Sequence, residues 1–211
     1  MNSLSKTLYL LKRFGNSLFT KDCISCGKPT RGSCLCEKCI EESAPSGNYR
    51  NGFACAFYYE GPAKDALLRF KFGGDYEFCF DTFCDWLLAA YEKLEEKDFD
   101  AVVPVPAFEC RNTRLSKLTE KFSLLSGIPF RPEYLKKIRR TEKQHKLSAS
   151  DRRLNLIGAF SAETSVRGKK ILLVDDIFTT GSTVAECANA LYDKGAEKVC
   201  VITLLKTKFD A

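Results

Sequence analysis

The sequence predicts an α/β fold in which a mostly parallel sheet is flanked by helices and preceded by a small cysteine-rich N-terminal module. Segments with strand and helix patterns alternate from residue 53 onward, an order that is typical of parallel sheets. Five of the eleven cysteines lie between Cys23 and Cys39, well before these segments. The chain has 211 residues, of which 45% are hydrophobic, enough for one domain of ordinary size plus a small module.

The N-terminal part is expected to span residues 1–45 and to contain an amphipathic helix followed by the cysteine module. The α/β domain is expected to span residues 46–211. The leucines near the N-terminus are spaced for one face of a helix and are interrupted by Lys12 and Arg13, which does not fit a secretory signal. The segment 41–52, rich in Gly, Ser, Pro and Asn, is the expected linker. No apolar run reaches the roughly 20 residues of a membrane span. We therefore expect a cytoplasmic protein without a membrane span.

The elements of the domain follow from apolar runs and from the residues that begin or end them. An aromatic-rich run at 53–59 is typical of a strand, and Gly61 with Pro62 opens a helix that runs to about residue 69. A helical pattern at 79–97 precedes a buried strand at 100–105. Glycines are expected to end the two later helices. The remaining elements are a helix at 115–125, a strand at 170–174, a helix at 183–194 and a strand at 198–205.

The cysteine module contains two Cys-x-x-Cys pairs, Cys23/Cys26 and Cys36/Cys39. Four thiolates suit the tetrahedral coordination of Zn²⁺, and four protein ligands leave no open position, so the zinc would be structural. Cys34 competes with Cys36 as a ligand, although it breaks the Cys-x-x-Cys spacing. Buried or reactive thiols without a metal are the alternative to a zinc site.

The run from 171 to 183 carries the strongest chemical signal. Four apolar residues form a strand, two carboxylates follow, and a loop rich in hydroxyl groups leads into a helix. Ligands of open α/β sheets bind at the carboxyl ends of strands, and the start of a helix binds phosphate. The run therefore predicts a sugar-phosphate site, unless Ser182 or Thr183 serves only as a helix cap. The residues of this run expected to bind the ligand are Asp175, Asp176, Thr179, Thr180, Gly181, Ser182 and Thr183.

Residues 174–183 resemble the 5-phosphoribosyl 1-diphosphate (PRPP) motif of type I phosphoribosyltransferases. The wider chain, over about residues 20–206, resembles the ComF/GntX family of that fold, whose members carry an N-terminal four-cysteine zinc module. The matching segments are Tyr59-Glu60-Gly61-Pro62, Lys71-Phe72-Gly73, Val103-Pro104-Val105-Pro106, the spaced residues Arg139, Thr141, Gln144, Leu147, Arg152 and Asn155, and Gly158-Ala159-Phe160.

This resemblance implies a role for each part of the site. Asp175 and Asp176 would hold the ribose hydroxyls, the loop 179–183 would hold the 5′-phosphate, and Mg²⁺ would bind with the diphosphate. The loop after Pro106 would bind pyrophosphate, and the basic segment 136–153 would close over the reacting centre. The residues implied to be catalytic are Arg111, Arg139 and Gln144.

One stretch departs from the family pattern. After the Pro-Val-Pro strand, the family has a segment like Arg-Gly-Phe-Asn-Gln, whereas this chain has Arg111-Asn112-Thr113-Arg114-Leu115-Ser116-Lys117-Leu118. The altered stretch lies on the pyrophosphate side, so it favours ligand binding over turnover.

The net charge of +6 lies in the segment 136–153, which holds eight basic and two acidic residues. Such a local excess indicates an anionic partner, unless it is only a solvated surface. The cations would stabilise a leaving diphosphate or bind nucleic-acid phosphates, and these two functions are compatible. The residues expected to contact nucleic acid are Lys136, Lys137, Arg139 and Arg140.

Two functions compete. The first is a protein that binds PRPP, or a related ribose phosphate, with Mg²⁺ and acts in DNA uptake or nucleic-acid processing. The family's link to natural competence implies this function, with single-stranded DNA and helicase-type competence proteins as partners. The second is an active phosphoribosyltransferase, in which a nitrogen nucleophile displaces pyrophosphate from PRPP. No general base is identifiable, and His145 is the only histidine, which excludes a metal site with two histidine ligands.

Overall fold

The computed structural model describes residues 7, 11, 14–15, 18–46, 52–73, 76–107, 113–141 and 156–208, with only the backbone at 76 and 77. At its centre is a four-stranded sheet in the order β3-β8-β7-β4, and all of its strands are parallel. The parallel sheet predicted from the sequence is confirmed. The strands are β3 (Phe53–Tyr58), β4 (Ala101–Pro104), β7 (Lys170–Phe178) and β8 (Lys198–Lys206).

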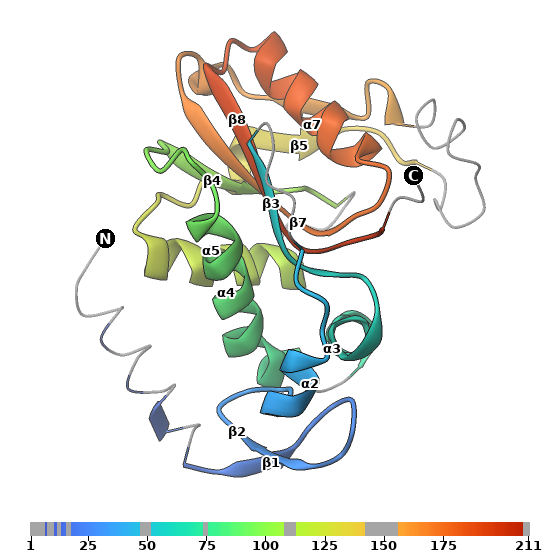
Figure 1. Cartoon of the computed structure of the whole chain (residues 1–211). Coiled ribbons are helices and arrows are strands. Elements are labelled where there is room, and N and C mark those ends of the chain that lie inside the picture. Colours follow the sequence, from blue (N-terminus) through green and yellow to red (C-terminus); the bar gives the residue numbers. More distant parts are fainter. Residues whose placement is uncertain are drawn as a thin grey trace.

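Helices cover both faces of the sheet (Figure 1). Helices α4 (Tyr76–Glu92) and α5 (Arg114–Ser126) lie on one face, and α7 (Ser182–Asp193) lies on the other. Alternate residues of β7 point to opposite faces. Leu172 and Val174 join the hydrophobic cluster of α4 and α5, whereas Ile171 and Leu173 join the cluster of α7.

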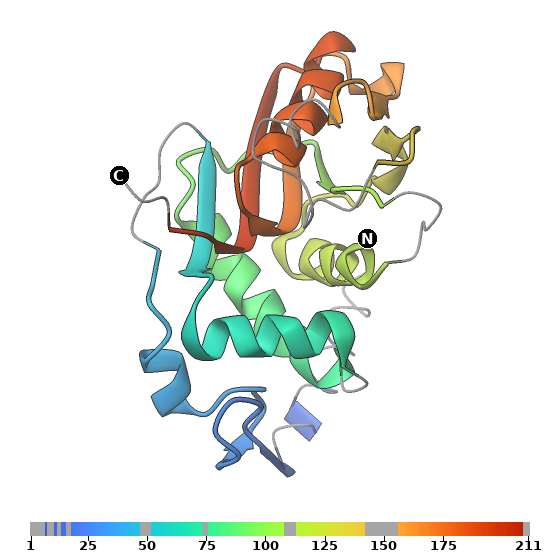
Figure 2. The same ribbon diagram turned by 90° about the vertical axis from the view of Figure 1, so that its right-hand side faces the viewer.

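The N-terminal module lies at one end of the molecule and consists of β1 (Thr20–Asp22), β2 (Pro29–Arg31) and α2 (Glu37–Glu41). Helix α3 (Gly61–Phe72) lies between this module and the sheet (Figure 2). Cys23, Leu35 and Cys39 belong to the same hydrophobic cluster as the buried residues of α3 and α4. The module therefore packs directly onto the domain. The amphipathic helix expected at 1–20 falls largely outside the described residues.

Several predicted boundaries were wrong because tertiary contacts move them. β7 does not end at Val174 but continues to Phe178, since β8 runs beside it as far as Lys206. Helix α3 extends to Phe72 rather than ending near Arg69, because the Arg114 guanidinium of α5 donates to the carbonyls of Phe70 and Gly73 at this end. Helix α4 ends at Glu92 rather than near Lys97, because the Lys97 ammonium folds back and donates to the Tyr91 carbonyl at 2.7 Å.

The basic segment 136–153 was predicted to be a loop that closes over the reacting centre, but its first residues belong to a strand. Residues 135–137 form a strand, β5 (Leu135–Lys137), which pairs antiparallel with β6 (Phe160–Ala162). Short 3₁₀ turns at Pro132–Tyr134 and Thr164–Val166 flank this pair. Strands of three residues are too short to give a periodic signal, so the sequence did not reveal them. Among the described residues, no helix is both long and apolar enough to cross a membrane.

Candidate metal centre and phosphate-binding site

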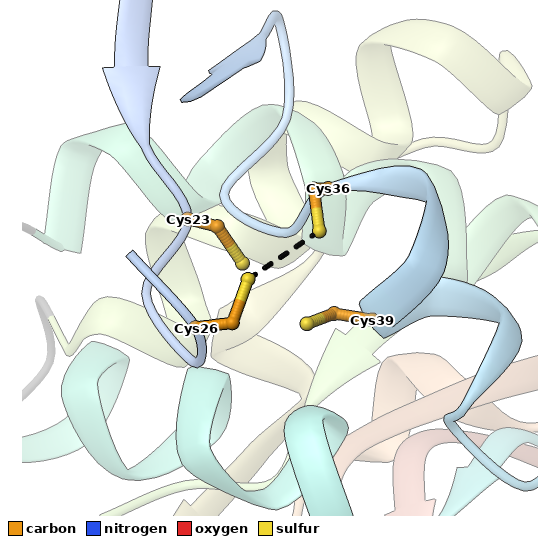
Figure 3. Close-up of side chains that lie close together, drawn as sticks. All are labelled: Cys23, Cys26, Cys36 and Cys39. Atoms are coloured by element: carbon orange, nitrogen blue, oxygen red, sulfur yellow. Dashed lines mark hydrogen bonds between the residues drawn. The ribbon is translucent and has the colours of Figure 1, made fainter. Parts of the chain in front are cut away.

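Two elements of the N-terminal module bring four cysteine side chains together (Figure 3). Cys23 and Cys26 lie between β1 and β2, whereas Cys36 and Cys39 lie at the start of α2 and within it. Their sulfur atoms all lie within 4.8 Å of one another, and Cys26 Sγ and Cys36 Sγ are 3.6 Å apart. Four sulfurs at about 2.3 Å from one Zn²⁺ would lie roughly 3.8 Å from one another. The cluster therefore fits a tetrahedral metal site.

The turn after Cys23 also supplies backbone donors. Gly27 has a φ of 72° and its N–H donates to the Cys23 carbonyl at 2.9 Å, which closes the turn. Burial raises the pKa of the Cys23 thiol, but hydrogen bonds from the N–H groups of Cys26 and Cys36 outweigh burial and bring the pKa down to about 6. A thiolate is the form of cysteine that binds metal, so the backbone prepares Cys23 for that role.

Cys34 lies outside the four-sulfur cluster. It is buried, and its N–H donates to Thr82 Oγ1 of α4 at 2.9 Å. A side-chain hydrogen bond with Cys79 lowers the pKa of the Cys34 thiol, because it stabilises the thiolate. Of the two cysteines that the sequence left open, the structure thus brings Cys36 into the cluster and ties Cys34 to α4.

The two aspartates of the predicted phosphate site lie near the end of β7 and have different surroundings. The Asp176 N–H donates to Asp175 Oδ1 at 2.8 Å. Asp176 Oδ2 forms an ion pair with Lys71 Nζ of α3, also at 2.8 Å. A backbone hydrogen bond therefore links the two aspartates, and a cation from another element pairs with Asp176.

Burial raises the pKa of the Asp175 carboxyl to about 8, and the negative charge of Asp176 adds to this rise. The Asp176 N–H and the Lys71 ammonium oppose it but are weaker. Near neutral pH the pair therefore carries less than two negative charges. A protonated carboxyl can both donate and accept a hydrogen bond, so Asp175 can still bind a hydroxyl group while repelling an anionic ligand less.

The loop that follows β7 depends on a glycine. Gly181 has a φ of 75°, and a Cβ at this position would lie 2.5 Å from the ring of Phe178. Thr180 Oγ1 and Ser182 Oγ are 2.9 Å apart and share a hydrogen bond. The N-cap of α7 is Gly181, which has no side chain that could cap the helix. Because Gly181 is the cap, neither Ser182 nor Thr183 serves as the cap of α7. Hydroxyl groups beside the start of a helix suit the binding of a phosphate.

Three of the four basic residues predicted to bind nucleic acid have partners within the chain. Lys136 forms an ion pair with Glu163, and the Lys137 ammonium donates to Thr141 Oγ1 at 2.7 Å. Burial lowers the pKa of Lys137. Arg139 Nη2 donates to the Ile157 carbonyl at 3.0 Å, and Arg140 is exposed. Arg111 and Gln144, two of the three residues predicted to be catalytic, lie outside the described residues.

Two further residues make contacts that the sequence reasoning did not predict. Lys71 lies in the Lys-Phe-Gly stretch that matches the family, but a single lysine in a helix is usually a surface residue. Arg114 is part of the altered stretch that the family resemblance places on the pyrophosphate side. Its guanidinium instead donates to two backbone carbonyls at the end of α3, those of Phe70 and Gly73. Neither contact has a local sequence signal, because each joins elements far apart in the chain.

Comparison with known proteins places this geometry in a family. A profile of the phosphoribosyl transferase domain matches residues 116–209. The DNA utilization protein YhgH of Escherichia coli K12 is 30% identical over 194 residues, 88% of this chain and 84% of that protein. YhgH of E. coli O157:H7 is 38% identical over 113 residues, 51% of this chain and only half of that protein. The competence protein ComFC of Bacillus subtilis is 28% identical and covers 88% of this chain and 78% of its own length.

The parallel sheet, the acidic strand end and the hydroxyl loop thus define a phosphoribosyltransferase-type protein with an added four-cysteine module. Within that class, the chain belongs to the ComF family, to which YhgH and ComFC also belong. The resemblance that the sequence suggested is confirmed.

Proposed function

We propose that this protein binds PRPP with Mg²⁺ at residues 175–183 and acts in DNA utilization. The arrangement of the acid pair, the Gly181 loop and the start of α7 at one edge of a parallel sheet carries the ligand part of the proposal. The DNA part is supported by relatives named for DNA utilization and for competence.

In this proposal each part of the site binds one part of the ligand. Asp176 accepts hydrogen bonds from the ribose hydroxyls, and Asp175, when protonated, can both donate to them and accept from them. The 5′-phosphate lies against the first turn of α7, where backbone N–H groups and the hydroxyls of Thr180 and Ser182 donate to its oxygens. Mg²⁺ neutralises the diphosphate of the ligand, as it prefers phosphate oxygens with few protein ligands.

We also assign Zn²⁺ to the four-cysteine cluster, in a structural role. Four thiolates without an open position are typical of structural zinc. No cysteine in the described part of the chain forms a disulfide. This supports a reducing, cytoplasmic location, since thiols persist as such in that compartment.

Calorimetry with PRPP and Mg²⁺ tests the ligand-binding part. The wild-type protein should bind, and its thermal stability should rise with ligand concentration. Asp176→Asn and Thr180→Val should each weaken binding by about 1–3 kcal/mol, the typical cost of losing a buried or charged hydrogen-bond partner. Asp193→Asn, at the exposed far end of α7, is the matched control and should bind as wild type does. No heat and no stabilisation for the wild type would refute the proposal.

For DNA, we propose that the basic segment contacts phosphates through Lys136, Lys137, Arg139 and Arg140. Affinity for single-stranded DNA should fall steeply with salt and vary little with sequence. Changing these four residues to glutamine should reduce both the affinity and its salt dependence. Changing Lys38, Lys64, Lys117 and Lys169, which lie outside the basic segment, to glutamine alters the net charge equally and is the control. Equal loss in both variants would place the DNA site elsewhere or leave only a general charge effect.

Turnover distinguishes the binding protein from an active phosphoribosyltransferase. In the enzyme, a nitrogen–C1 bond forms as the bond between C1 and the diphosphate oxygen breaks, and pyrophosphate is released. Release of pyrophosphate when PRPP is mixed with nucleobases, amines or ammonia would establish the enzyme. Binding of PRPP without any release is the result that we expect, because the stretch after β4 departs from the family pattern.

A further inference from the structure

The ion pair between Lys71 and Asp176 joins α3 to the end of β7, and the PRPP motif does not account for it. The two charged groups are 2.8 Å apart. Both are partly accessible, with 29% of the Lys71 side chain and 23% of the Asp176 side chain exposed. An ammonium has three N–H donors, and this pair uses one of them. Lys71 can therefore keep its contact with Asp176 and donate to a ligand at the same time.

The backbone that carries Lys71 is held in place. Arg114 Nη1 donates to the carbonyl of Phe70, directly before Lys71, and Arg114 Nη2 donates to that of Gly73 at 3.2 Å. The Gly73 N–H closes the last turn by donating to the Arg69 carbonyl at 2.7 Å. A cation at this end of a helix also interacts favourably with the helix dipole. The Arg114 guanidinium of α5 therefore holds the backbone on both sides of Lys71.

The position of Lys71 relative to Asp176 indicates which part of a ligand it would meet. If a ribose places its 2′-hydroxyl against Asp176, the neighbouring ring carbon is C1, which carries the diphosphate of PRPP. The 5′-phosphate lies instead against the loop and the start of α7, which belong to different elements. A cation beside Asp176 is therefore suited to a negative charge attached at C1.

We propose that Lys71 is a specificity residue that selects ribose 5-phosphates bearing an anionic group at C1. This inference rests on the proposed PRPP site and adds to it a residue from α3. Arg114, in the described part of the altered stretch after β4, contacts the end of α3, whereas Lys71 lies beside the acid pair.

The test compares two ligands that differ at C1. We would measure the affinities of PRPP and of ribose 5-phosphate, each with Mg²⁺, by calorimetry on the full chain. Wild type should prefer PRPP. Lys71→Met, which keeps the length of the side chain but removes the charge, should bind PRPP about 10- to 100-fold more weakly, the usual effect of losing a charge-assisted hydrogen bond. Its affinity for ribose 5-phosphate should change no more than a few-fold.

Two variants sharpen the comparison. Lys71→Arg keeps the positive charge and should retain the preference for PRPP. Lys64→Met removes an exposed lysine from the same helix, whose ammonium lies over the ring of Tyr59, and should behave as wild type does. Thermal unfolding of each unliganded variant verifies that it is folded.

The outcomes separate this inference from the proposed function. If Lys71→Met loses affinity for both ligands equally, or for neither, Lys71 does not select the C1 group and the inference is wrong. If wild type binds both ligands equally well, the inference is also wrong, but the ribose-phosphate site stands. If wild type binds neither ligand, the proposed function itself fails.

Discussion

At the scale of single residues, Asp175 and Asp176 differ because one carboxyl is buried beside a like charge and the other meets Lys71. The pKa of Asp175 rises from 3.8 to about 8 on folding. Between these values the folded protein binds more protons than the unfolded chain, so the free energy of unfolding should fall as pH rises from about 4 to about 8. Asp175→Asn removes this titration. Its stability should therefore fall less than that of wild type over the same range in urea unfolding, and equal pH profiles would contradict the assignment.

Gly181 allows a second prediction at this scale. Gly181→Ala must adopt a positive φ and place a methyl group against the Phe178 ring, so it should lose about 1–3 kcal/mol of stability and most PRPP affinity. Gly168 has a similar φ of 69° but open space around its Cβ position, so Gly168→Ala isolates the cost of the backbone conformation. Urea unfolding of both variants measures the difference. If the two lose the same stability, the contact with Phe178 has no energetic effect.

At the scale of elements, the sequence predicted which segments are helices and which are strands. It did not predict the ends of the elements whose last residues depend on contacts with distant parts of the chain. Apolar runs and glycines located β4, α5, α7 and β8 closely, because these signals are local. The last turn of α3 depends on Arg114, and the last residues of β7 depend on β8. The motif at 175–183 could be recognised from its residue types alone, whereas the Lys71–Asp176 contact requires the fold.

The contact between α5 and α3 is testable by removing its side chain. Arg114→Met should lower the free energy of unfolding by about 1–3 kcal/mol, since two carbonyls at the end of α3 lose a charged donor. It should also weaken PRPP binding, because Lys71 lies in that last turn. Lys117→Met, an exposed position on α5, is the control. Wild-type stability and affinity in Arg114→Met would show that the contact does not position α3.

At the scale of the whole molecule, the N-terminal module shares a hydrophobic cluster with α3 and α4. Loss of the metal should therefore destabilise the domain as well as the module. Chelation of zinc should lower the free energy of unfolding by more than about 2 kcal/mol and the melting temperature by roughly 4–8 °C or more. Elemental analysis should find about one zinc per chain in wild type and in Cys34→Ser, and loss of zinc in Cys36→Ser. Retention of zinc in Cys36→Ser with its loss in Cys34→Ser would reverse the choice of ligand.

The order of the sheet has a consequence for how the protein is made. β8 lies between β3 and β7, so the first strand of the sheet pairs with a strand about 150 positions later in the chain, a separation that slows folding. During synthesis, β3 and one side of β7 have no partner until β8 leaves the ribosome. Nascent chains therefore pass through a period in which unpaired strand edges are exposed, a state prone to aggregation. Cells that make this protein in quantity should depend on chaperones during that interval.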